Sequence, residues 1–106
     1  MELQWWCKTI GDWAKRKGWH DRPVPFPEFI ALCHSELSEA LEEDRNNAGD
    51  FYTKDGKPEG RAVEVVDCLI RILHHAEKEG WDLDKLLTIK MKYNENRDYR
   101  HKGKAY

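Results

Sequence analysis

The stretch AVEVVDCLIRILHHAEKE, residues 62–79, decides the fold class of this 106-residue chain. Its apolar residues recur every three or four positions, which is the spacing of an α-helix. They cover roughly half of the helix circumference, more than a helix on the surface of a small domain needs. Gly80 follows, and glycine commonly ends helices. We therefore expect a helix that packs against two neighbours, one of which can belong to a second subunit.

Three further helices are expected around this one, over residues 2–17, 27–45 and 82–98. Prolines before the second helix favour an extended connector, and Asp82 has the side chain of an N-cap. Residues 46–60 contain Asn, Gly, Asp and Pro and read as a turn-rich loop, a type that is often functional. We expect one all-α domain over residues 1–106, four-helix bundle-like, which oligomerises through its helices into a homodimer or homotetramer.

The composition limits the possible partners. Charged residues make up 36% of the chain and apolar residues 40%, with a net charge of -2, as in a folded and highly charged helical protein. A nucleic-acid-binding protein would be more basic, so no nucleic-acid partner is expected. Three cysteines without CxxC spacing read as small core residues in a reducing compartment. With neither a signal pattern nor a spanning apolar run, the expected location is the cytoplasm, without a membrane partner.

Four carboxylates occur as two pairs at helical spacing, Glu36 with Glu39 and Glu64 with Asp67. Residues three apart lie on one helix face, so each pair can share a ligand. If the two helices pack antiparallel, the pairs converge, and their like charges repel unless a cation neutralises them. Oxygen ligands without His or Cys are typical of Mg²⁺, for which Mn²⁺ can substitute. The alternative is a solvated, salt-bridged helix surface, on which such pairs are common.

The last helix carries a stripe that changes from apolar to cationic. The face that begins with Leu83 and Leu86 continues through Lys90, Asn94 and Arg97. Cations directed toward an acidic metal cluster suit phosphate binding, in which the metal takes some oxygens and Lys or Arg takes the others. The alternative is that the helix end frays into solvent and its cations only complement the helix dipole.

Three segments resemble the MazG-like nucleoside triphosphate pyrophosphohydrolases, part of an all-α superfamily that includes the dimeric dUTPases. They are SELSEALE at 35–42, EVVD at 64–67, and KYNENR at 92–97, which leads to RHKGK at 100–104. The family pattern is EExxE, a variable gap and then ExxD. Ser35 stands where that pattern has its first glutamate, and the four remaining acids are in place.

The resemblance implies Mg²⁺-dependent hydrolysis of (deoxy)nucleoside triphosphates to the monophosphate and pyrophosphate, as in nucleotide-pool cleansing. It implies that the metal ligands are Glu36, Glu39, Glu64 and Asp67, with Glu36 or Glu39 as the catalytic base. It also implies substrate-binding residues, with Lys90, Asn94, Arg97 and Lys104 at the phosphates or sugar and Trp19 and His20 at the nucleobase.

Three other protein classes share some of these features. A ferritin-like di-metal bundle requires Glu-x-x-His pairs, which this sequence lacks. An HD-type phosphohydrolase is suggested by His20-Asp21, but that dipeptide lies in a proline-rich connector without accompanying metal histidines. A non-catalytic helical interaction or regulatory module with a vestigial metal site remains open.

Overall fold

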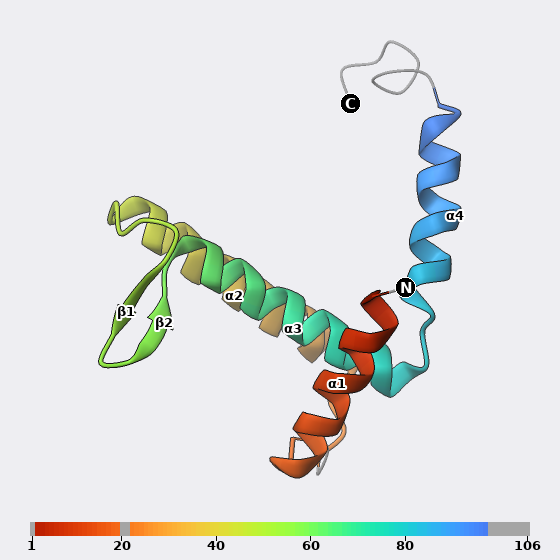
Figure 1. Ribbon diagram of the computed structural model, residues 1–106, viewed down its shortest axis with the longest axis horizontal. Helices are drawn as coiled ribbons and strands as arrows, with labels where there is room; N and C mark the ends of the chain where they lie inside the picture. The colour runs from red at the N-terminus through yellow and green to blue at the C-terminus, as the bar shows by residue number, and fades with distance from the viewer. Residues whose placement is uncertain (1, 20–21, 98–106) are drawn as a thin grey trace.

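The computed structural model describes residues 2–19 and 22–97, most of which are helical (Figure 1). In chain order the elements are α1 (Glu2–Arg16), α2 (Phe26–Arg45), β1 (Tyr52–Lys54), β2 (Lys57–Glu59), α3 (Arg61–Glu79) and α4 (Leu83–Glu95). The expected helices are confirmed, although α4 ends at Glu95, earlier than predicted. No helix among the described residues is long and apolar enough to cross a membrane.

Helices α2 and α3 lie side by side and run antiparallel, forming the long axis of the molecule (Figure 1). Helix α2 starts directly after Pro25 and has Pro27 in its first turn, where a missing N–H group costs no hydrogen bond. Phe29 and Cys33 of α2 pack against Cys68 of α3 in one small core cluster. This pairing sets the acidic faces of both helices next to each other.

Helix α1 crosses α3 near its C-terminal end (Figure 1). Cys7 and Ile10 of α1 pack against Leu73 and Ala76 of α3 in a second core cluster. Helix α3 therefore has a neighbour on two sides, which confirms the expectation drawn from its wide apolar face. All three cysteines of the chain are buried free thiols, as their lack of CxxC spacing suggested.

The segment expected to be a loop contains a short antiparallel hairpin, β1–β2, in which Tyr52 pairs with Glu59. Asp55 and Gly56 form its turn, both with positive φ, a backbone conformation that Asp-Gly sequences favour. The strands have only three residues each, too few for an alternating pattern to be recognised in the sequence. The hairpin returns the chain from the end of α2 to the start of α3.

Helix α4 points away from the α2–α3 pair and contacts chiefly α1 (Figure 1). Asp82 is its N-cap, as predicted, and accepts a hydrogen bond of 3.0 Å from the Lys85 N–H. Two further bonds of 3.1 Å tie the starts of α1 and α4 together, from the Gln4 N–H to Asp84 and from the Leu83 N–H to Gln4. The direction of α4 is therefore set by α1 and not by the α2–α3 pair.

Candidate metal centre

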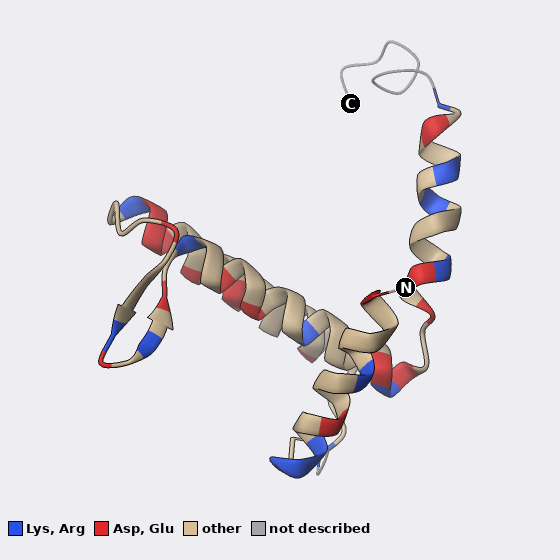
Figure 2. Ribbon diagram, viewed as in Figure 1, with Lys and Arg blue, Asp and Glu red and all other residues tan. Residues whose placement is uncertain are grey.

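Three of the four carboxylates singled out in the sequence meet between α2 and α3. Glu36, Glu64 and Asp67 each place one oxygen within 4.8 Å of the others. Glu36 and Glu64 are each only 9% exposed, so these acids border the core and are not an ordinary solvated surface. Figure 2 shows the acidic residues along α2 and α3 where the two helices lie together. We call Glu36, Glu64 and Asp67 the central triad.

Glu64 has a clearly raised pKa. Burial, reinforced by the neighbouring Glu39 carboxylate and then by the charges of Asp67 and Glu36, raises the pKa of Glu64 to about 7. Its Oε2 atom is buried and has no hydrogen-bond partner. A buried carboxylate oxygen without a partner is costly. A hard divalent cation fits this position, because the donors are all carboxylate oxygens and their charges need neutralising.

The fourth predicted ligand, Glu39, lies one turn along α2 from Glu36 and is more exposed. Its influence on the pKa of Glu64 places its carboxylate beside Glu64 at the edge of the central triad. Glu39 can therefore join a cation site there.

Arg71 connects the central triad to a cavity. Its Nη2 atom lies 3.6 Å from Oε1 of Glu36, across the α2–α3 interface. The cavity has a volume of about 320 Å³, within the usual size range of small-molecule sites. Its walls combine aromatic rings with cations, among them Trp19, Phe29, Arg71, His74, His75 and Lys78.

The aromatic wall of the cavity is well packed. The His75 ring stacks on Phe29 with centroids 3.9 Å apart, and Trp19 lies edge-on to Trp13 at 4.7 Å. Trp19, predicted from the resemblance to contact a base, thus does line a cavity. His20, predicted beside it, lies outside the described residues.

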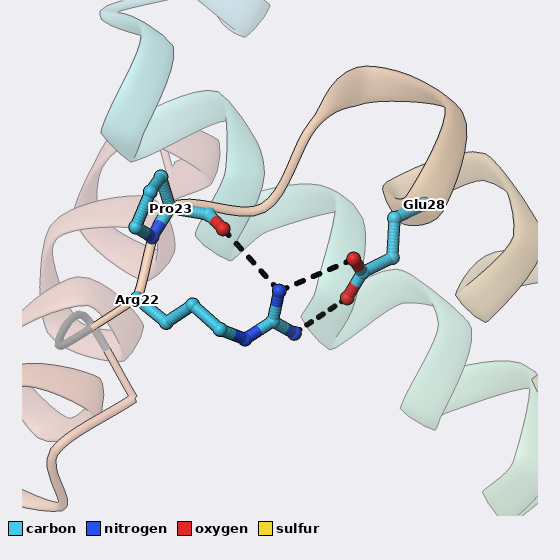
Figure 3. A network of polar contacts seen from close by, with 3 residues as sticks. All are labelled: Arg22, Pro23 and Glu28. Carbon is cyan, nitrogen blue, oxygen red and sulfur yellow. Dashed lines mark hydrogen bonds and ion pairs between the residues drawn. The ribbon is translucent and has the colours of Figure 1, made fainter.

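The connector before α2 closes one side of this cavity. Arg22 lines the cavity, and its Nη1 donates to Oε1 of Glu28 at 3.2 Å and to the Pro23 carbonyl oxygen at 3.4 Å (Figure 3). Its Nη2 donates to Oε2 of Glu28. An exposed ion pair of this kind adds little to stability. Its two-pronged geometry nevertheless fixes the guanidinium at the cavity wall.

Arg71, His74 and Lys78 were not identified from the sequence as residues of a site. The signal that identifies them is their helical spacing. They continue, one turn at a time, the same narrow strip of α3 that carries Glu64 and Asp67. This strip starts with the carboxylates of the central triad and continues with basic side chains that line the cavity.

The cationic stripe of α4 does not reach the carboxylates within one chain. Lys90 and Asn94 are exposed on α4, which points away from α2 and α3 (Figure 2). Lys90 and Arg97 lie over the Tyr93 ring, at 5.1 and 5.7 Å from its centroid. The expectation that the stripe faces the same interior as the acids fails in the single chain, because α4 is tied to α1. Lys104 lies outside the described residues.

Comparisons of the chain with models of known protein families, with curated proteins and with solved structures found no significant match. The assignment of the site therefore depends on its own geometry and chemistry.

The raised pKa of Glu64 predicts how the stability of the metal-free protein depends on pH. The folded state keeps a proton on Glu64 that the unfolded state has released, so stability should fall as pH rises from 4.5 to about 7. Glu64→Gln should remove this loss and stabilise the metal-free protein at pH 8 by about 1–3 kcal/mol, with little effect at pH 4. Urea denaturation in EDTA at both pH values measures the difference. Exposed Glu42→Gln is the matched control, and identical pH profiles for Glu64→Gln and wild type would contradict the prediction.

Proposed function

We propose that this chain is a Mg²⁺-dependent nucleoside triphosphate pyrophosphohydrolase that releases the monophosphate and pyrophosphate, with nucleotide-pool cleansing as its role. The observation that carries the proposal is the buried, unpartnered Glu64 oxygen within the central triad. Carboxylates that face each other at such short range indicate a cation. The adjoining cavity supports a substrate that combines anionic groups with a flat ring.

The proposed role of each acidic residue follows from its position. Glu36, Glu39, Glu64 and Asp67 hold the cation, and Mn²⁺ substitutes for Mg²⁺. The bound metal supplies neutralisation of phosphate charge and lowers the pKa of water. Glu39, the more exposed acid on α2, is placed to take the proton of the attacking water, with Glu36 as the other candidate.

The cavity supplies the substrate contacts. Arg71 and Lys78 offer donors to phosphate oxygens, and Trp19 offers a face on which a base can stack. Arg71 touches both regions, because it lines the cavity and contacts Glu36. A triphosphate that spans from Trp19 to the central triad passes this guanidinium.

The test is a panel of canonical and modified (d)NTPs with Mg²⁺, Mn²⁺ or EDTA, with products separated by ion-exchange chromatography. We expect at least one nucleotide to yield its monophosphate and pyrophosphate, with no turnover in EDTA. Release of orthophosphate and a diphosphate would show cleavage at the terminal phosphate and contradict the proposed reaction. A folded protein inactive on the whole panel would contradict the enzyme assignment.

We also propose that the chain forms a homodimer or homotetramer through helices. All four helices expose large apolar side chains. On α2, α3 and α4 they include Leu37 and Leu41, then Val65, Val66 and Leu69, and finally Leu86, Leu87, Ile89 and Met91. A second copy that covers these faces would complete the four-helix bundle that the single chain leaves open. It would also allow Lys90, Asn94 and Arg97 to approach the carboxylates of the other copy.

Light scattering at micromolar concentration should give the mass of a dimer or tetramer. Val65→Asp combined with Leu69→Asp should reduce that mass to the monomer, because it puts charge into the face that the second copy would bury. Lys54→Asp, a charge change on the exposed hairpin, should leave the wild-type mass unchanged. A monomeric wild type would refute oligomerisation.

The second candidate function is a non-catalytic helical interaction or regulatory module with a vestigial metal site. The exposed apolar side chains of α4, such as Leu86 at 52% and Ile89 at 55%, favour it because such surfaces bind other helices. Binding of Mg²⁺ and nucleotide without turnover would support this module over the enzyme.

A further inference from the structure

A second group of three carboxylates lies beside the central triad. Glu43 from the last turns of α2, Glu59 at the end of β2, and Glu64 each place one oxygen within 4.8 Å of the others. We call these residues the hairpin triad. The function proposed above uses neither Glu43 nor Glu59.

The hairpin holds this triad in position. The Tyr52 hydroxyl donates a 2.9 Å hydrogen bond to Oε1 of Glu43, and Tyr52 is the cross-strand partner of Glu59. One short element therefore orients an acid from α2 and supplies another from β2. A hydrogen bond to one oxygen of a carboxylate fixes its direction, as partners in the outer shell of metal sites do.

The hairpin triad differs from an ordinary acidic surface patch because it contains Glu64. The residue is only 9% exposed, its Oε2 atom has no hydrogen-bond partner, and its carboxylate lies within both triads. A carboxylate has two oxygens and can bridge two cations. The buried atom therefore indicates a ligand at the junction of the two groups.

The hairpin also supplies a cation of its own. The Lys57 Nζ atom lies 3.2 Å from Oε1 of Glu59, on a side chain that is 75% exposed. One exposed ammonium offsets one negative charge, so the triad keeps a net negative charge. A compact divalent ion can take all three oxygens at once, and the flexible Lys57 side chain can then move into solvent.

We propose that Glu43, Glu59 and Glu64 form a second site for Mg²⁺ or Mn²⁺, bridged by Glu64 to the site of Glu36 and Asp67. This inference deepens the proposed function and rests on it for the first cation. Two cations that share one carboxylate form a clamp with a spacing of about 3.5–4 Å, which suits adjacent phosphate groups. The substrate class is therefore a nucleotide whose polyphosphate spans both ions.

The experiment is a Mn²⁺ titration of the full chain without nucleotide, followed by electron paramagnetic resonance and calorimetry. Wild type should bind two Mn²⁺ per chain with a spin-coupled signal. Glu59→Gln and, independently, Glu43→Gln should bind one and lose the coupling, and Asp67→Asn should also lose one. Glu42→Gln, an exposed acid on the same helix as Glu43, should keep both.

Substitution of Lys57 provides a second test, in which Mn²⁺ should bind more tightly instead of being lost. Lys57→Met should tighten the second Mn²⁺ about 3–10-fold, because it removes a competing positive charge beside the ligands. Lys54→Met, which changes the residue paired with Lys57 across the hairpin, should alter the affinity by less than about twofold.

The outcomes separate this inference from the proposed function. One Mn²⁺ per chain in wild type and in both hairpin-triad variants would overturn the second site and leave the first intact. No Mn²⁺ in wild type would overturn both. Two uncoupled ions that persist in Glu59→Gln and Glu43→Gln would overturn the bridge and the hairpin triad as its ligands.

Discussion

Asp67→Asn is expected to reduce Mg²⁺-dependent pyrophosphate release by about 100-fold or more while leaving the helices folded. The substitution keeps the size of the side chain but removes a charge from the central triad, where three carboxylate oxygens lie within 4.8 Å. The amide binds a hard cation more weakly. Steady-state kinetics over a range of Mg²⁺ concentrations, with circular dichroism to check folding, measure the effect.

The matched control for Asp67→Asn is Asp12→Asn, the same chemical change at an exposed position of α1. It should retain wild-type activity, because Asp12 does not belong to either triad. Partial rescue of Asp67→Asn by high Mn²⁺ would identify the defect as weakened cation binding. Wild-type activity of Asp67→Asn at low Mg²⁺ would remove Asp67 from the site.

Gly60→Ala is expected to lower the free energy of unfolding by about 2–4 kcal/mol, the largest stability loss that we predict for a single methyl group. Gly60 has a φ of +125°, and a Cβ atom there would lie 2.4 Å from the backbone oxygen of Asp50. Backbone atoms cannot move aside as a flexible side chain can. Urea denaturation of wild type and variant measures the loss.

The same substitution should also weaken cation binding. Gly60 is the N-cap of α3, and its carbonyl oxygen accepts a 3.0 Å hydrogen bond from the Glu64 N–H. A shift at Gly60 therefore moves the carboxylate that both triads share. Gly56→Ala is the matched control, since φ there is +79° but nothing lies within 4 Å of the added Cβ. It should cost only about 1–2 kcal/mol, and an equal loss in both variants would refute the backbone clash.

Helical periodicity in the sequence was enough to find the elements of this fold. The apolar spacing of residues 62–79 indicated a helix with two neighbours, and α3 does contact α1 and α2. The Asp82 N-cap marked the start of α4. These features depend on residues within a few positions of each other, whose geometry the helix itself fixes.

The candidate site was predictable only within each helix. The three-residue spacing of Glu64 and Asp67 predicted that both lie on one face of α3. It could not predict that Arg71 contacts Glu36 or that Glu59 lies near Glu43. Those contacts depend on how α2 and α3 are set against each other and on a hairpin too short to show a strand pattern. The direction of α4 was likewise beyond the sequence, because hydrogen bonds of Gln4 to residues at the start of α4 decide it.

The sequence by itself therefore determined the helices, the N-cap of α4 and two acidic pairs, all of which follow from short-range geometry. Only the tertiary structure decided that Glu64 is buried with an unpartnered oxygen, that a cavity opens beside Arg71, and that Glu43 of α2 and Glu59 of the hairpin lie next to Glu64. The physical reason is that burial and convergence depend on contacts between segments far apart in the chain, which no local pattern records.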